Sequence, residues 1–393
     1  MAPPPNSSLM GPQPQPRVGR EQVDKNKAAR SVRSAWPITR TQRGGITKTI
    51  QNRSRGFDNG GNWCYRNATL QILLHIPKFM NIVIDHNAPG PNGVINNVCP
   101  LAQQARHCYT CRLKALIQEY WGPNNINATT NFPNFIPNNH PAFASITRRF
   151  RARFGQNQDD PADALLWYLS RIYRSLHHQN PQAQFDSLFS ITIRTGHQCP
   201  NPNCNHVNLP YPPNTPSDVK HNGLNGIPFH TTNPTTVQAA IDDHYAPAPY
   251  HMQTVCSQCN QGATMNVVQK IVAAPENLLV TLALNSGSLV NGVWRLTKTM
   301  NHITLTDPLD LTNMQVYNSK PLWYDLISVS CHGGASGNGG HWISTVKGYG
   351  HGRYQLSDRD VYQVPKSTLT DNPQQLPYGG PMEVAVLMYK RGS

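Results

Sequence analysis

The spacing of apolar residues predicts helices in the first half of the chain. In "YRNATLQILLHI" (65–76), Leu70, Leu73 and Leu74 fall at positions i, i+3 and i+4, on one face of a helix that Pro77 ends. Further helical stretches are "CPLAQQARHCYTCRLKALIQEYW" (99–121) and "DDPADALLWYLSRIYRSLHH" (159–178). The second begins with acidic residues, which the dipole of a helix favours at that end.

From about residue 185 the pattern changes to the alternation that is typical of strands. A short helix is predicted at 235–245, between the first and second of the strands given next. The predicted strands are "FDSLFSITIRT" (185–195), "MNVVQKIVAA" (265–274), "ENLLVTLAL" (276–284), "WYDLISVSC" (323–331), "HWISTVKGY" (341–349) and "EVAVLMYKR" (383–391). The last three are expected in one sheet. Helices first and strands later indicate an α+β fold whose two layers pack together.

Composition narrows the class of protein. The 393 residues can bury a sizeable core, while 38% hydrophobic and 14% charged residues leave room for long polar loops. The sequence has no run of 18 apolar residues and no apolar segment typical of a signal peptide. We therefore expect an intracellular protein, in the cytoplasm, the nucleus or both. In such a protein, nine cysteines favour metal binding, catalysis or burial over disulfides.

The net charge of +14 is concentrated at the start of the chain. Residues 1–55 contain 11 Lys and Arg against 2 Asp and Glu, a balance of +9, and the rest contributes +5. Residues 1–53 begin with many Pro and Gln and show no helical or strand period, so we predict a disordered basic tail there. Such a tail could bind nucleic acid weakly. We expect no membrane contact and no nucleic-acid site on the folded part.

A Trp-Cys pair stands at the start of the first predicted helix. In "GGNWCYRN" (60–67), Cys64 would gain thiolate character from the helix dipole and from the backbone N–H groups of the first turn. The glycines before it allow a sharp turn and the close approach of a substrate. The alternative is an ordinary core cysteine, because free cysteines are among the most buried residues.

A nucleophilic cysteine needs a base, which is often a histidine far away in the sequence. His341 follows a Gly-rich stretch and opens a predicted strand, so its ring could project from the edge of a sheet. Ser357 and Asp358 follow some sixteen residues later and could orient the imidazole as the third group of a triad. Each residue alone could be structural, but together with Cys64 they favour a cysteine-dependent enzyme.

Two close pairs of cysteines indicate a metal site. Cys199 with Cys204, and Cys256 with Cys259, lie in turn-like stretches, and 52 residues separate the pairs. Four thiolates suit a tetrahedral structural zinc, which would join the two ends of a long excursion of the chain. The alternative is four thiols without a metal.

Cys108 and Cys111 form a third pair, inside a predicted helix, where positions i and i+3 share a face. With Cys99 nearby, a second metal is conceivable. The sequence offers no evident fourth ligand beyond His107, so we interpret this pair as structural.

Several blocks together resemble the ubiquitin-specific proteases. "GFDNGGNWCYRNATLQILLHIPKF" (56–79) is similar to the cysteine box of that family, "QDDPADALLWYL" (158–169) to its Gln-Asp box and "YDLISVSCHGGASGNGGHWISTV" (324–346) to its histidine box. The resemblance covers about residues 54–391. It implies a papain-like α+β cysteine peptidase with a thumb at about 56–180, zinc-pinned fingers at about 185–270 and a palm at about 271–391.

The resemblance also implies roles for single residues. Cys64 becomes the nucleophile, His341 its general base and Asn59 the side-chain donor to the oxyanion. A donor of this kind acts where charge develops in the transition state. Ser357 is the residue that aligns with the third triad position, and Asp358 is its required or assisting neighbour.

The implied reaction is thiol-dependent hydrolysis of peptide or isopeptide bonds after the C-terminal Gly-Gly of ubiquitin, without a catalytic cofactor. Asp160 and Asp163 would pair with arginines of the ubiquitin tail, although helix capping is the alternative. Gly340 and Trp342 would contact the tail. A mobile loop over its two glycines would be formed by Gly333, Gly334, Gly339 and Gly340. The partners would be ubiquitin and ubiquitinated proteins. Alternatives are a weakly active or inactive ubiquitin-binding scaffold, or a protease for another ubiquitin-like modifier.

Overall fold

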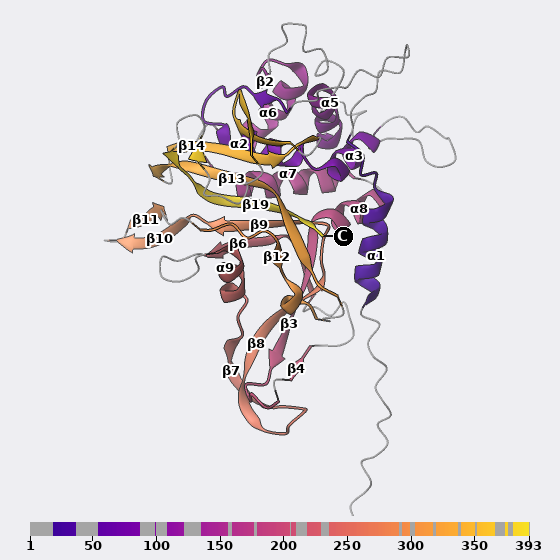
Figure 1. The fold of residues 1–393 in the computed structure, drawn as a ribbon, viewed down its shortest axis with the longest axis vertical. Helices are drawn as coiled ribbons and strands as arrows, with labels where there is room; N and C mark the ends of the chain where they lie inside the picture. Colours follow the sequence, from indigo (N-terminus) through magenta and orange to yellow (C-terminus); the bar gives the residue numbers. More distant parts are fainter. Residues whose placement is uncertain are drawn as a thin grey trace, which may run out of the picture.

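Helices and strands separate along the chain, with helices in the first half and most strands in the second. The computed structural model describes residues 19–36, 54–86, 99, 108–121, 135–155, 159–176, 179–204, 206–209, 218–228, 236–290, 293–298, 303–316, 320–336, 339–349, 352–365, 374–375 and 380–392. Helices gather around one end of a large sheet, and a second sheet projects beyond its other side (Figure 1). The prediction of an α+β fold is confirmed.

The helices beside the large sheet form the part that we call the thumb. They are α2 (Cys64–Leu73), α3 (Pro77–Asp85), α5 (Tyr109–Trp121), α6 (Pro141–Phe154), α7 (Pro161–Ser175) and α8 (Gln179–Phe189). Every residue of α2 is buried, because α7 and the large sheet both pack against it. Pro77 is the first residue of α3, a position where its missing N–H costs nothing, so this proline also starts a helix.

Helix α7 is close to its prediction from sequence. Asp160 caps its start and accepts a hydrogen bond from the N–H of Ala162 (2.8 Å), and Pro161 occupies the first helical position. A buried stripe then follows the helical period at Ala164, Leu165, Tyr168, Leu169 and Ile172.

The large sheet, which we call the palm, has eight strands in the order β16-β15-β14-β13-β19-β9-β6, with β12 paired to β13. Their bounds are β6 (Leu224–Pro228), β9 (Asn277–Ala283), β12 (Leu309–Asp310), β13 (Trp323–Ser336), β14 (Gly339–Lys347), β15 (Arg353–Ser357), β16 (Asp360–Val364) and β19 (Glu383–Arg391). The first seven residues of β19 are all buried, as expected for a strand covered on both faces. The three C-terminal strands do share one sheet, as predicted.

A five-stranded sheet, which we call the fingers, extends away from the palm (Figure 1). It comprises β3 (Ser190–Gln198), β4 (Val207–Asn208), β5 (Asp218–Asn222), β7 (Ala248–Val255) and β8 (Gly262–Ala273). Strand β6 and helix α9 (Val237–His244) lie between β5 and β7 in the chain, yet β6 pairs with β9 of the palm and α9 packs on β6. The fingers therefore differ from the continuous segment predicted at about 185–270.

The described part of the chain also contains several shorter elements. They are β1 (Gly56–Phe57) paired with β2 (Phe135–Ile136), β10 (Asn285–Val290) paired with β11 (Val293–Lys298), the 3₁₀ turn Thr312–Met314, and β17 (Gln374–Gln375) paired with β18 (Gly380–Pro381). Among the described helices, none has the length and hydropathy that crossing a bilayer requires.

The prediction of a strand from residue 185 is wrong for its first five residues, which form the end of α8. Phe185, Leu188 and Phe189 are almost fully buried and lie at i, i+3 and i+4, a helical stripe that runs without a break into β3. A short apolar run of this kind fits either period, and packing decides between them.

The predicted disorder of residues 1–53 is wrong for residues 19–36. Gly19–Ser31 form helix α1, which packs against α8 and β8. Gln22 exchanges two hydrogen bonds with the backbone of Ala274 (3.1 and 2.6 Å), and Ala29 and Val32 are buried. Because these contacts are made with distant parts of the chain, local composition did not reveal them. Residues 1–18 and 37–53 lie outside the described part.

Contact between α2 and β14 sets the thumb against the palm. The hydroxyl of Ser344 on β14 donates to the backbone carbonyl of Ala68 on α2 (2.9 Å), and both groups are buried. This contact fixes the start of α2 beside the strand that carries His341.

Candidate active site

Cys64 is the first residue of α2 and is 3% exposed. Burial raises the pKa of its thiol from 9.0 to about 11, and the charge of Asp358 acts in the same direction. Hydrogen bonds from the backbone of Trp342 on β14 and from the first turn of α2 lower the pKa by less. The thiolate character expected from the helix start is therefore outweighed by burial. At neutral pH a base must take the proton from the sulfur.

His341 lies on β14, directly before the residue whose backbone contacts the Cys64 sulfur. Its Nε2 is 2.8 Å from the hydroxyl oxygen of Ser357, and its Nδ1 is 4.0 Å from a carboxylate oxygen of Asp358. When Nε2 carries the proton and donates to Ser357, Nδ1 holds the lone pair that a general base needs. The structure thus brings all four predicted catalytic residues together.

The β15–β16 turn that carries Asp358 is tied to the segment ahead of Cys64. Asp358 has φ +50°, a left-handed conformation that Asp tolerates better than most residues, and its carbonyl accepts from the N–H of Phe57 (2.7 Å). Arg359 donates to the carboxylate of Asp58 (2.8 Å). At Gly56 a Cβ would lie 2.4 Å from two carbonyl oxygens of the turn, so this close approach requires glycine.

The carboxylate of Asp358 joins the turn to two asparagines. Nδ2 of Asn59 donates to one oxygen (2.8 Å), and Nδ2 of Asn67 donates to the other (2.7 Å). Burial raises the pKa of Asp358, whereas these donors and the charge of His341 act in the opposite direction. Asp358 therefore positions Asn59 as well as facing the imidazole.

Asn59 is held at both ends of its amide. Its carbonyl oxygen accepts from the N–H groups of Gly61 (3.2 Å) and Trp63 (3.1 Å), and its NH₂ donates to Asp358. An amide NH₂ has two hydrogens, and this contact uses one of them. The side chain is thus fixed beside Cys64 with a second N–H that can donate to a developing negative charge.

A buried arginine supports this loop, and sequence analysis missed it. The guanidinium of Arg66 lies 4.9 Å from the ring of Trp63 and 4.5 Å from that of Phe143. It donates to the hydroxyl of Thr147 (2.8 Å) and to the carbonyl of Asp58 (3.1 Å), and burial lowers its pKa to about 10. Trp63, directly before Cys64, therefore covers a charged group that fixes the approach to α2.

Two of the four glycines expected in a mobile loop pair in the β13–β14 hairpin, Gly333 with His341 and Gly339 with Ser336, and the register is irregular between these pairs. Gly340 has φ +151°, and a Cβ there would lie 2.2 Å from the Gly333 carbonyl oxygen and 2.5 Å from Nε2 of His332. Trp342 is 6% exposed, and its ring packs on that of His332 with centroids 4.5 Å apart. Trp342 thus offers its backbone, not its ring, to the site.

Behind this hairpin lies a buried ion pair that sequence analysis also missed. Nζ of Lys298 is 2.6 Å from the carboxylate of Glu383, and both side chains are 1% exposed. The same ammonium donates to the carbonyl of Gly334. Burial, followed by the charges of Lys298 and His341, lowers the pKa of His332 to about 4, so His332 is neutral at physiological pH.

The predicted acidic positions lie at the start of α7. The hydroxyl of Thr69 on α2 donates to the carbonyl of Pro161 (3.1 Å), which ties this end of α7 to the helix of Cys64. Asp160 caps α7, and burial raises its pKa to about 6. Asp163 is largely exposed to solvent, and the partial loss of water around its carboxyl group, followed by the charge of Asp159, raises its pKa. Asp160 therefore has the capping role that was the alternative to substrate binding. Asp163 caps nothing in the described structure and faces solvent.

The four finger cysteines meet as the sequence predicted. Their sulfurs all lie within 4.8 Å of one another. The Cys199–Cys259 and Cys204–Cys256 distances are each 3.8 Å. Zinc–sulfur bonds of ~2.3 Å in a tetrahedron place sulfurs ~3.8 Å apart, so this donor set fits a metal ion.

Comparison with known proteins agrees with this geometry. Residues 55–389 match the family model described as ubiquitin carboxyl-terminal hydrolase. Ubiquitin carboxyl-terminal hydrolase 17-like protein B of Mus musculus is 24% identical over 335 residues, 82% of this chain and 63% of that protein. Ubiquitin carboxyl-terminal hydrolase 36 of Drosophila melanogaster is 23% identical over 306 residues, 74% of this chain and 26% of that protein. The chain spans less than two thirds of the length of these relatives.

The fold is similar to those of solved structures. A chain of the SAGA DUB module bound to monoubiquitin aligns with a TM-score of 0.67 and 17% identity, covering 90% of this chain and 72% of that chain. A chain of the same module bound to ubiquitin aldehyde aligns with a TM-score of 0.66 and 17% identity, covering 89% and 72%.

Proposed function

This chain belongs to the ubiquitin carboxyl-terminal hydrolase family, and from that premise we propose that it is a deubiquitinase. It hydrolyses the peptide or isopeptide bond after the C-terminal Gly-Gly of ubiquitin. The observation that carries this proposal is the meeting of Cys64 at the start of α2 with His341 and its partner Ser357 on the facing palm strands.

In the first half of the reaction, His341 takes the proton from the Cys64 thiol and the sulfur attacks the carbonyl carbon of the last glycine. The carbonyl oxygen becomes an oxyanion, and the second N–H of Asn59 and backbone N–H groups at the start of α2 donate to it. The C–N bond then breaks, and His341 gives its proton to the departing lysine amine. The product is a thioester on Cys64.

In the second half, water attacks the thioester carbonyl while His341 removes one of its protons. A second tetrahedral oxyanion forms at the same donors. The C–S bond breaks, His341 returns a proton to the Cys64 sulfur, and ubiquitin leaves with a free C-terminal carboxylate. No metal or organic cofactor takes part in either half.

Ser357 and Asp358 support His341 in different ways. Ser357 holds the ring through Nε2 at 2.8 Å and leaves Nδ1 to act as the base. Asp358, 4.0 Å from Nδ1, attracts the imidazolium that forms after proton transfer and at the same time holds Asn59. Ser357 is thus the orienting partner, and Asp358 acts through charge and through the oxyanion donor.

The substrate tail would lie between the start of α7 and the β13–β14 hairpin. Asp160 and Asp163 supply carboxylates for arginines of the tail, since charge-assisted bonds of this type give strength and register. A Cβ at Gly340 would meet the Gly333 carbonyl oxygen and the His332 ring inside the hairpin, so glycine lets the backbone here keep the shape that would face the two glycines of the tail.

A structural zinc held by Cys199, Cys204, Cys256 and Cys259 would join the β3–β4 and β7–β8 turns. The ion supplies folding energy to the tip of the fingers and no catalytic chemistry, because all four positions of a tetrahedral site are filled by thiolates. The fingers would then grip the globular part of ubiquitin.

We place the protein inside the cell, where reduced thiols persist, with ubiquitin and ubiquitinated proteins as partners. The test is hydrolysis of ubiquitin carrying a fluorogenic amide at its C-terminus. The chain and its His244→Ala variant, altered at an exposed histidine of α9, should hydrolyse it, and Cys64→Ala and His341→Ala should not. Saturable ubiquitin binding without hydrolysis would instead indicate a scaffold. Activity only on another ubiquitin-like modifier would show that this modifier, and not ubiquitin, is the substrate.

A further inference from the structure

A second group of metal-binding side chains lies in the thumb. It comprises His86, Cys99, Cys108 and Cys111, whose ligand atoms all lie within 4.8 Å of one another. The three cysteines form no disulfide, and Cys99 and Cys108 are 1% and 3% exposed. Two buried thiols, a partly exposed third thiol and an imidazole around one point form a donor set that one metal ion can share.

Three of the four ligands lie at the ends of thumb helices. His86 follows the last residue of α3, Cys108 precedes the first residue of α5, and Cys111 lies in its first turn. Nε2 of His86 is 3.2 Å from Sγ of Cys108. Bonds of ~2.0–2.1 Å to nitrogen and ~2.3 Å to sulfur place tetrahedral ligands ~3.6 Å apart. The pair is thus close to the spacing that one shared ion requires.

The sequence offered His107 as a fourth ligand, and that residue lies outside the described part of the chain. The structure supplies His86 instead, 22 residues before Cys108. Its backbone carbonyl accepts from Nζ of Lys114 (3.1 Å), which fixes the residue to α5. The helix face shared by Cys108 and Cys111 therefore meets a histidine that no short motif connects to it.

We propose that these four residues bind a second structural zinc ion. Three thiolates and one imidazole form a ligand set that is typical of tetrahedral zinc, and they fill its coordination completely. The ion would join the end of α3 to the start of α5, while the finger cysteines bind another ion at the far end of the molecule.

The position of this ion links it to the helix of the nucleophile. At the other end of α5, the hydroxyl of Tyr120 donates to Gln71 (2.8 Å) and the indole N–H of Trp121 donates to the carbonyl of Leu74 (2.9 Å). Both acceptors belong to α2 or its C-terminal turn. An ion that anchors the start of α5 therefore stabilises the support of α2.

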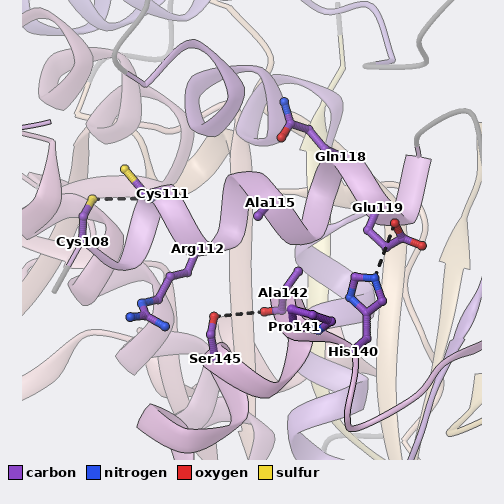
Figure 2. Close-up of a pocket in the computed structure, with 10 residues that line it drawn as sticks. All are labelled: Cys108, Cys111, Arg112, Ala115, Gln118, Glu119, His140, Pro141, Ala142 and Ser145. Carbon is purple, nitrogen blue, oxygen red and sulfur yellow. Dashed lines mark hydrogen bonds and ion pairs between the residues drawn. The ribbon is translucent and has the colours of Figure 1, made fainter. Parts of the chain in front are cut away.

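The site also borders the surface. A groove of about 620 Å³ is lined by residues of α5 and by residues at the start of α6. Among its lining residues, Cys108 and Cys111 lie at one end and His140 and Glu119 at the other (Figure 2). Cys111 is partly exposed. A chelator or a thiol reagent can therefore reach the ion from this groove without unfolding the thumb.

The test counts zinc in the full chain by elemental mass spectrometry, with protein concentration from amino-acid analysis. The wild-type chain should hold two zinc ions, and His86→Ala or Cys108→Ser should hold one. His140→Ala, which changes the histidine at the opposite end of the groove, should still hold two. Cys256→Ser should lose the other ion, and its combination with Cys108→Ser should leave none. One zinc in the wild type, or two in His86→Ala, would overturn the proposal.

Cobalt substitution gives a readout that needs no change in the thumb. In the wild-type chain, thiolate-to-cobalt absorption should arise from seven thiolates, four in the fingers and three in the thumb. In Cys256→Ser chains, a tetrahedral cobalt spectrum should remain and should disappear on chelation. A Cys108–Cys111 disulfide in the wild type, seen by mass spectrometry of alkylated peptides, would assign these thiols to redox chemistry instead. Neither result depends on deubiquitinase activity.

Discussion

Replacement of Asp358 by Asn tests how much Asp358 contributes to catalysis compared with Ser357. The change removes one charge and exchanges one carboxylate oxygen for an NH₂ group. The carboxylate accepts from Nδ2 of Asn59 and of Asn67, so the new NH₂ must face one of these NH₂ groups. One of the two hydrogen bonds is lost, and a buried donor without a partner costs about 1–3 kcal/mol. If the new NH₂ faces Asn59, the oxyanion donor loses this hydrogen bond and is held only through its carbonyl oxygen.

The expected magnitude follows from these contacts. Loss of one oxyanion donor typically costs ~10²–10³ in kcat. The lost attraction between the carboxylate and an imidazolium 4.0 Å away adds to this, between ~1 kcal/mol in water and ~4 kcal/mol at a surface site. The Ser357→Ala change removes one neutral hydrogen bond of about 0.5–1.5 kcal/mol, which corresponds to ~2–10-fold. We expect Asp358→Asn to lower kcat ~100-fold or more and Ser357→Ala to lower it ~10-fold or less.

Stopped-flow and steady-state hydrolysis of the fluorogenic ubiquitin amide give kcat and KM for each variant. The control is Asp360→Asn, an exposed aspartate of the same hairpin, which should retain activity. Thermal unfolding shows whether each variant is folded at the assay temperature. If Ser357→Ala were the more severe change and Asp358→Asn nearly silent, the carboxylate would have no part in holding Asn59 during the reaction.

Three further changes test separate parts of the molecule. In Asp160→Asn the helix cap is kept, and kcat/KM should fall ~10–100-fold, mainly through KM, if the carboxylate binds an arginine. Because the pKa of Asp160 rises from 3.8 to about 6 on folding, its contribution to stability is present below pH ~4 and lost as pH rises through 6. In urea unfolding, the stability of the variant relative to the wild-type chain should therefore be greater at pH 7.5 than at pH 4. If the difference in free energy of unfolding between variant and wild type were the same at both pH values, the argument from burial of Asp160 would be refuted. Gly340→Ala forces a Cβ into backbone and should cost at least ~1–3 kcal/mol and most activity, whereas Gly339→Ala, which meets open space, should do neither. Lys298→Met leaves Glu383 buried without a partner and should cost about 3–5 kcal/mol in urea unfolding, most of which Glu383→Gln in the same chain should restore.

Much of the fold could be predicted because its longest elements have strong periods. Helix α7 combines a cap, a first-turn proline and an apolar stripe, and β19 is an unbroken apolar run. Helix α1 could not be predicted, because its support comes from Ala274 and other residues more than 150 positions away. The start of β3 was misplaced because the apolar residues of α8 fit a strand equally well over five positions.

The candidate site was predictable where one short stretch carries the chemistry. Cys64, His341 and Ser357 stand in such stretches, and the structure brings them together. The supporting residues were not predictable, because their partners are distant: Arg66 lies under aromatic rings, and His86 is far from the cysteines that it faces. The raised pKa of the Cys64 thiol was also not predictable, because it results from burial by distant parts of the chain.

The central claim is that Cys64 is a nucleophile aimed at the C-terminus of ubiquitin. The most direct measurement is covalent capture by ubiquitin that carries an electrophile at its C-terminus, followed by peptide mapping of the adduct. We predict one adduct per chain, on Cys64, which is lost in Cys64→Ala and kept in Cys331→Ala, a change at a buried palm cysteine outside the site. Absence of an adduct on the folded wild-type chain, or an adduct on another cysteine, would contradict the claim.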